Sequence, residues 1–124
     1  MRKLTLSPLS HTWILDLDGT LVKHNGYLID GKDSMLPGAK EFLASIPQND
    51  SIIILTSRDE KYRDKTIKFL NREGICYDAI LFNIPYGERI VMNDKKNSGL
   101  ETAKAVNVER NSACEIEIEI DSKL

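Results

Sequence analysis

The sequence predicts an α/β protein in which helices flank an open, mostly parallel β-sheet. Apolar runs of strand length alternate with segments that have helical spacing of their apolar residues. The first strand-like segment begins at Trp13 and carries Asp16 and Asp18 at its carboxyl end, just before Gly19, where a parallel sheet would place ligand-binding groups. Because 124 residues with 41% hydrophobic content can bury one core, we expect residues 1–124 to form a single domain.

After the first strand, residues 21–36 are rich in Gly, Asn and Asp, and the Asn25-Gly26 pair is a strong hairpin-turn signal. We interpret this segment as a short flap. Pro37-Gly38 then opens a helix that runs to about Ser45, and Pro47 ends it.

The alternation continues through the second half of the chain. Residues 51–57 are expected to form a buried strand, and residues 58–73 a helix that Gly74 closes. Further expected elements are a third strand over 77–82, a fourth over 89–93 and a helix over 99–106. Only residues 84–88 separate the third and fourth strands, whereas a parallel crossover takes about a dozen. Either the chain crosses the sheet in extended form, or these two strands pair differently.

The C-terminal tail, residues 113–124, contains alternating Glu and Ile from Glu115 to Ile120. This period of two predicts an edge strand with one apolar face. Such a strand adds to a sheet of the same chain or of a partner chain. A homo-oligomer is therefore one of the expectations.

The composition excludes several classes of function. The net charge is −2, which gives no basic excess for binding nucleic acid. The two cysteines, Cys76 and Cys114, form no paired spacing for zinc or for a disulfide framework, which favours a reducing cytoplasm. The longest apolar run is four residues, so we expect no membrane span and no secretory signal.

Asp16 and Asp18 are unfavourable together at the end of a strand unless a cation binds beside them. Mg²⁺ is the natural candidate, because it prefers oxygen ligands. A carboxylate attacks a phosphoryl group when a cation offsets the repulsion between the two anions, and a neighbouring acid suits general acid catalysis. An isolated Asp-x-Asp is more often an acidic turn or a helix cap. The longer string is what favours phosphate chemistry here.

That string, Asp-Leu-Asp-Gly-Thr over residues 16–20, resembles the first motif of the haloacid dehalogenase (HAD) superfamily of phosphatases and phosphotransferases. The resemblance implies that Asp16 forms an aspartyl phosphate and that Asp18 protonates the leaving group. Gly19 and Thr20 would then belong to the turn that binds the phosphate. The superfamily's pumps carry threonine in place of Asp18, so the resemblance favours a hydrolase.

Two further sites follow from the same resemblance. Thr56 ends the second strand where the superfamily's second motif donates a hydroxyl to the phosphoryl group. Ser57 either caps the next helix or assists the phosphate, and Arg58 either contacts the substrate or begins a solvated helix. Asp94, after the expected fourth strand, matches the fourth motif and would join Asp16 and Asp18 as a Mg²⁺ ligand, unless it belongs to a polar turn.

The chain departs from the superfamily at the third motif, because residues 83–88 contain no lysine. The candidates elsewhere are Lys65, Lys95 and Lys96. We select Lys96 because it follows Asp94 closely. The missing lysine also leaves a second function open, that of a non-catalytic protein that binds a phosphorylated sugar.

Neither position at which the superfamily inserts a cap domain has room for one. The motifs DLDGT, LTSR, PYGER and NDKK together are similar to small bacterial HAD proteins associated with capsule or surface-polysaccharide biosynthesis. The resemblance implies a magnesium-dependent phosphatase that acts on a small substrate, a phosphorylated sugar or sugar intermediate. An uncapped crevice of this kind acts on large substrates or borrows walls from neighbouring subunits.

Overall fold

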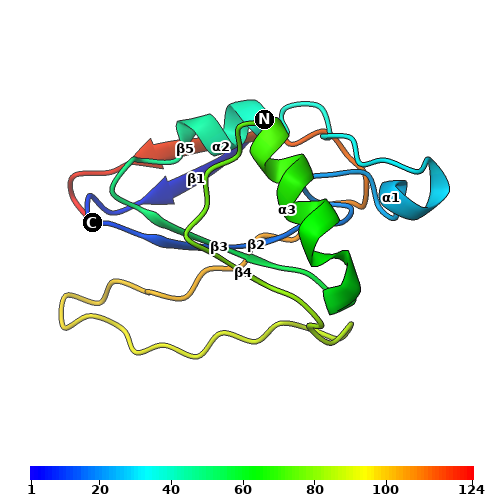
Figure 1. Ribbon diagram of the computed structural model, residues 1–124. Coiled ribbons are helices and arrows are strands. Elements are labelled where there is room, and N and C mark those ends of the chain that lie inside the picture. Colours follow the sequence, from blue (N-terminus) through cyan, green and yellow to red (C-terminus); the bar gives the residue numbers. More distant parts are fainter.

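The computed structural model describes all residues, 1–124, as a small α/β fold with parallel strands in open sheets, which confirms the predicted fold class (Figure 1). No helix has the length and apolar character needed to cross a membrane. The strands are β1 (Arg2–Leu6), β2 (Thr12–Asp16), β3 (Ser51–Leu55), β4 (Ala79–Leu81) and β5 (Ile116–Ile120). The helices are α1 (Gly26–Ile29), α2 (Ala39–Ser45), the 3₁₀ helix η1 (Glu60–Tyr62) and α3 (Arg63–Arg72).

The three-stranded sheet has the order β2-β3-β4, and both of its pairings are parallel. In this register Asp16 of β2 lies opposite Leu55 of β3, and Leu55 lies opposite Leu81 of β4. The carboxyl ends of β2 and β3 therefore meet at one edge of the sheet. Asp16 and Thr56, the residue after β3, are brought to that edge as predicted from the sequence.

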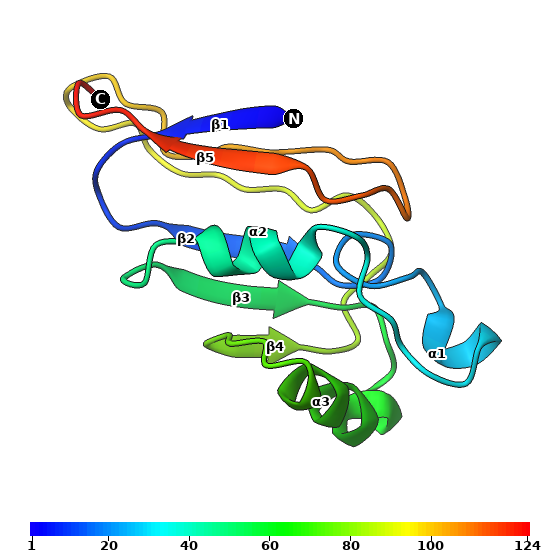
Figure 2. The ribbon, with the colours of Figure 1, turned by 90° about the horizontal axis from the view of Figure 1, so that it is seen from above.

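Helices α2 and α3 cover the same face of this sheet, as Figures 1 and 2 show. The buried core lies between them and the strands, and it includes Ala39 of α2, Ile54 of β3, Leu70 of α3 and Ile80 of β4. Burying side chains of this size stabilises the fold by roughly 1.5–3 kcal/mol each. The predicted helix after Pro37-Gly38 is confirmed, with its bounds at Ala39 and Ser45.

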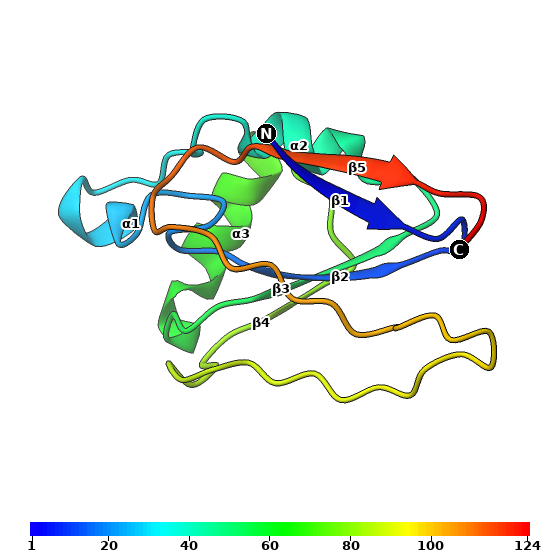
Figure 3. The ribbon, with the colours of Figure 1, turned by 180° about the vertical axis from the view of Figure 1, so that it is seen from behind.

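The strand expected over 89–93 and the helix expected over 99–106 are not formed, because residues 83–115 are irregular apart from turns. Ile90 and Met92 are 87% and 94% exposed instead of buried in a sheet. The physical reason lies in the link to β4, which is too short for the crossover that a parallel neighbour requires. The segment instead makes a long extended excursion below β4, which Figure 3 shows in yellow and orange.

The C-terminal strand is confirmed as β5, and it pairs in parallel with β1 at the opposite end of the chain. Leu4 lies opposite Ile118, and Lys3 forms an ion pair of 3.0 Å with Glu119. The tail thus adds to a strand of its own chain. Strand β1 was not predicted from the sequence, because its five residues include only two apolar ones.

A polar network joins the chain before β2 to the chain before β3. The Asp50 carboxylate accepts hydrogen bonds from the Trp13 indole (2.9 Å) and the His11 backbone N–H (2.9 Å), and it lies 2.8 Å from His11 Nδ1. Its side chain is only 1% exposed. Burial raises the pKa of Asp50, but the hydrogen bonds from Trp13 and His11 outweigh burial and hold this pKa below its usual value.

We expect Asp50→Asn to destabilise the fold at pH 5 by about 1–3 kcal/mol, because buried donors lose an ionised acceptor. A depressed pKa in the folded state stabilises the fold above the unfolded pKa, and this stabilisation is lost as the pH falls through the folded value. The difference between the two proteins should therefore shrink from pH 5 to pH 2. Urea unfolding at both pH values measures it, and a difference that grows on acidification would contradict the assignment.

Candidate active site

The turn after β2 is tightly folded and carries the first motif. Gly19 adopts a positive φ of 86°, which favours glycine, and its backbone N–H donates to the Val22 carbonyl (2.7 Å). The Thr20 hydroxyl donates to Asp16 Oδ2 (2.9 Å). The structure therefore brings Asp16 and Thr20 together, with Thr20 orienting the Asp16 carboxylate.

An arginine donates a hydrogen bond to the other carboxylate oxygen of Asp16. Arg89 Nη1 donates to Asp16 Oδ1 (2.8 Å), and the two side chains are 30% and 37% exposed. Arg89 was not predicted from the sequence, although it directly follows residues 83–88, the stretch that lacks a third-motif lysine. Searching for any cation, instead of lysine alone, would have found it.

Thr56 is buried at the carboxyl end of β3, where its backbone N–H donates to the Leu81 carbonyl (2.9 Å). Its hydroxyl oxygen accepts from the backbone N–H of Arg58 (3.1 Å). The capping role considered for Ser57 falls to Asp59, which accepts from the Lys61 backbone N–H (2.8 Å). The regular helix accordingly begins later than predicted, at Arg63 after one 3₁₀ turn.

Arg58 lies buried between the first motif and the flap, with its side chain 1% exposed. All five of its side-chain N–H donors are used. Nε and Nη2 donate to Asp18 (3.0 and 2.9 Å), and Nη1 and Nη2 donate to Asp33 (3.0 and 2.7 Å). The remaining Nη1 donor reaches the Thr66 hydroxyl (2.8 Å). Arg58 is therefore not a solvated helix start, and in this arrangement it has no donor left for a phosphate.

Aromatic side chains cover this ion cluster. The Arg58 guanidinium lies 3.9 Å from the centroid of the Tyr27 ring, and Tyr27 packs edge-on against Tyr62. Burial lowers the pKa of Arg58, but the carboxylates of Asp18 and Asp33 outweigh burial and raise it above its usual value. No sequence pattern singles out Asp33, which stands in a polar loop without a motif around it.

The structure does not bring Asp94 or Lys96 to Asp16. Asp94 lies exposed in the irregular segment, where its carbonyl accepts from the side chains of Asn93 and Thr102. Lys96 is also exposed, and only its backbone makes hydrogen bonds: its N–H donates to the Leu100 carbonyl (3.0 Å) and its carbonyl accepts from the Gly99 N–H (2.8 Å).

The donor atoms expected to hold Mg²⁺ do not fit a metal site in this arrangement. No three His, Cys, Asp or Glu residues gather into a possible metal site. The carboxylate oxygens of Asp16 accept hydrogen bonds from Thr20 and Arg89, and those of Asp18 accept hydrogen bonds from Arg58. A divalent ion held by these acids would require the arginines to release them.

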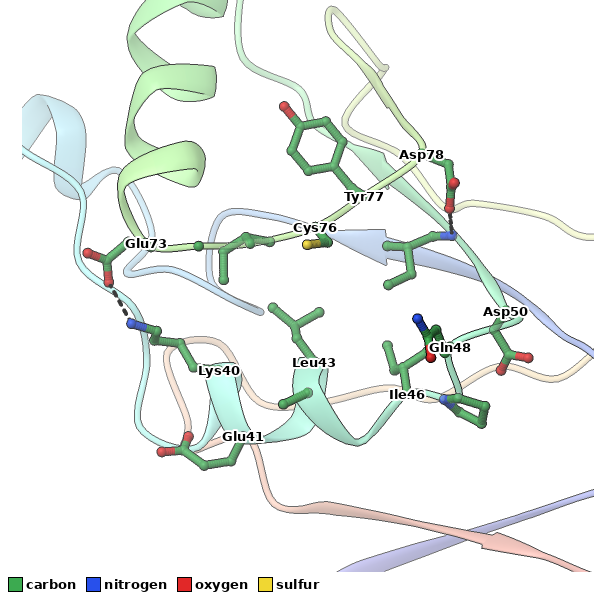
Figure 4. Close-up of a pocket in the computed structure, with 15 residues that line it drawn as sticks. Lys40, Glu41, Leu43, Ile46, Gln48, Asp50, Glu73, Cys76, Tyr77 and Asp78 are labelled. Atoms are coloured by element: carbon green, nitrogen blue, oxygen red, sulfur yellow. Dashed lines mark hydrogen bonds and ion pairs between the residues drawn. The ribbon is translucent and has the colours of Figure 1, made fainter.

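A cavity of about 610 Å³ lies away from these residues. Figure 4 shows it between α2 and the turn after α3, near the start of β3, with Leu43, Cys76 and Tyr77 among its walls. The ion pair between Lys40 and Glu73 (3.6 Å) lies at one end of it. None of the predicted site residues lines this cavity, so it is not the crevice at the carboxyl edge of the sheet.

Comparison with known proteins gives one family. Residues 11–101 match the family model described as NLI interacting factor-like phosphatase. The match covers most of the chain and includes Asp16, Asp18, Thr56 and Asp94. No curated protein and no solved structure matches the chain.

Proposed function

The chain belongs to the NLI interacting factor-like phosphatase family, and we propose that it hydrolyses a phosphomonoester with Asp16 as the nucleophile. Membership supports the phosphatase activity, and the HAD-like first motif supports the role of the acid. The observation that carries the proposal is the placement of the Asp16 carboxylate at the carboxyl edge of the sheet. One oxygen there accepts from Thr20 and the other from Arg89.

The reaction has two steps. An oxygen of Asp16 attacks phosphorus, the bond from phosphorus to the ester oxygen breaks, and Asp18 gives its proton to the departing alkoxide. Asp18 then takes a proton from water, which attacks the aspartyl phosphate and releases inorganic phosphate. Both acids return to their starting state. Asp18 must loosen its contact with Arg58 to carry the proton, because the two hydrogen bonds from the guanidinium stabilise the ionised carboxylate and not the neutral acid.

Arg89 takes the role that the sequence analysis gave to Lys96. Its guanidinium offsets the repulsion between the Asp16 carboxylate and an incoming phosphate, and its remaining N–H groups can donate to phosphate oxygens. Lys96 makes no side-chain contact with the first motif. Thr56 would donate its hydroxyl proton to the phosphoryl group, because its oxygen already accepts from Arg58 N–H. Ser57 and the turn at Gly19 remain the proposed phosphate-binding groups beside it.

We propose a sugar phosphate as the substrate and a polysaccharide pathway as its context. The similarity of the motifs to capsule-associated HAD proteins supports both. The alternative is a binding protein without turnover, and the ion pairs that engage both Asp16 and Asp18 favour it. A magnesium requirement is supported by the family, whose members typically use Mg²⁺, and not by the donor arrangement.

Asp16→Asn should lower phosphate release from sugar phosphates to background, because an amide is too weak a nucleophile to form the intermediate. Phosphate is measured with a panel of phosphorylated sugars and with p-nitrophenyl phosphate. Asp30→Asn is the matched control, because Asp30 is an exposed acid that pairs with Lys23 (2.8 Å). Tight binding of a sugar phosphate without release by the unmodified protein would instead support the binding protein.

Arg89→Ala should lower kcat/KM by about 100-fold, equivalent to roughly 2.7 kcal/mol of transition-state stabilisation. Lys96→Ala should change it less than about twofold, because exposed side chains without contacts contribute little. Steady-state kinetics on the best substrate of the panel compare the two variants. Equal losses of kcat/KM in the two variants, or a larger loss in Lys96→Ala, would contradict the role of Arg89 and support Lys96 as the catalytic cation.

Removal of divalent ions with EDTA should abolish phosphate release, and added Mg²⁺ should restore it. The assay uses the unmodified protein after exhaustive dialysis against metal-free buffer. Ca²⁺ serves as the control ion, because its larger size and flexible coordination suit this chemistry poorly. Full activity in EDTA would contradict the magnesium requirement.

A further inference from the structure

We infer that Asp33, on the flap, is a positioning residue for Asp18 and acts on it through Arg58. The inference rests on the proposed function, in which Asp18 moves the proton. Asp33 touches neither Asp16 nor Asp18 in any hydrogen bond. Its carboxylate instead accepts hydrogen bonds along the edge of the Arg58 guanidinium next to the edge that donates to Asp18.

The geometry of the cluster fixes each group in one orientation. A guanidinium is planar and presents its donors as a rigid fork, so two carboxylates can each take two parallel hydrogen bonds along different edges. Asp18 takes the edge formed by Nε and Nη2, and Asp33 takes the edge formed by Nη1 and Nη2. Because all five N–H donors are used, the Arg58 guanidinium cannot rotate without breaking a hydrogen bond at a site that is shielded from water.

Burial makes Asp33 the firmer of the two anchors. Its side chain is 2% exposed, whereas that of Asp18 is 15% exposed and reaches the surface of the site. Asp18 can therefore change its contact during a reaction while Asp33 keeps Arg58 in place. A positively charged group held in this way returns the Asp18 carboxylate to the same position after each turnover.

The same contact couples the flap to the catalytic acid. Asp33 and Tyr27 both belong to residues 21–36, and both contact the Arg58 side chain. The flap is also fastened at its base by the bridge between Val22 and Met35. The position of the flap and the orientation of Asp18 are thus set by one guanidinium.

Asp33→Asn tests the inference, because the amide nearly keeps the shape of the side chain but replaces one acceptor with a donor that faces Arg58. We expect kcat to fall by about 10–100-fold, as for a misplaced catalytic group, with KM changed less than about twofold. Asp30→Asn, which removes a flap charge in an exposed ion pair, should leave both constants within about twofold.

A second control separates positioning from loss of stability. Thr66→Val removes the fifth contact of Arg58 but keeps both carboxylate pairs. We expect it to lower the thermal midpoint while kcat stays within about threefold of the unmodified protein. If Asp33→Asn does not fold, Asp33→Glu, which keeps the charge on a longer side chain, is tested in the same way.

A readout that does not need activity keeps this inference separate from the proposed function. The ¹³C chemical shift of the Asp18 carboxylate should change in Asp33→Asn and stay constant in Asp30→Asn. If the unmodified protein releases no phosphate, the proposed function fails, while a changed Asp18 shift still supports the positioning contact. An unchanged shift together with unchanged kcat in folded Asp33→Asn would overturn the inference.

Discussion

The buried guanidinium of Arg58 is the interaction on which the arrangement of the site depends. It links four parts of the chain, namely the end of β3, the turn after β2, the flap and α3, through Asp18, Asp33 and Thr66. An unpaired charge at this depth would be destabilising by several kcal/mol, so the two carboxylates that pair with Arg58 stabilise the fold as well as the site. The flap and the first motif are consequently held by one group, through Asp33 on one side and Asp18 on the other.

The parallel pairing of β2 with β3 could be predicted because apolar runs report strands directly, and because carboxyl ends of parallel strands meet at one edge. That constraint placed Asp16 and Thr56 correctly without any knowledge of the contacts. Helix α2 followed from the Pro-Gly start and the proline stop, which act locally. Local backbone chemistry was less reliable elsewhere, because helix α1 begins at the Asn25-Gly26 pair expected to form a hairpin turn, and Asp59 caps in place of Ser57.

Contacts between distant loops could not be predicted in the same way. Asp33 and Arg89 stand in segments without periodicity, and their partners are 25 and 73 residues away in the chain. The strand expected over 89–93 failed for a different reason, since its apolar residues gave a strand signal that ignored the short link to β4. Asp94 and Lys96 were assigned from that strand, so their predicted places at the site depended on it.

Trapping the phosphorylated intermediate shows whether Asp16 accepts the phosphoryl group. The protein is mixed with substrate, quenched in acid after a few milliseconds, digested and examined by tandem mass spectrometry. We expect a phosphoryl group on Asp16 in the peptide that contains residues 13–20. Phosphorylation of a different residue, or phosphate release with no phosphorylated peptide at any time point, would contradict it.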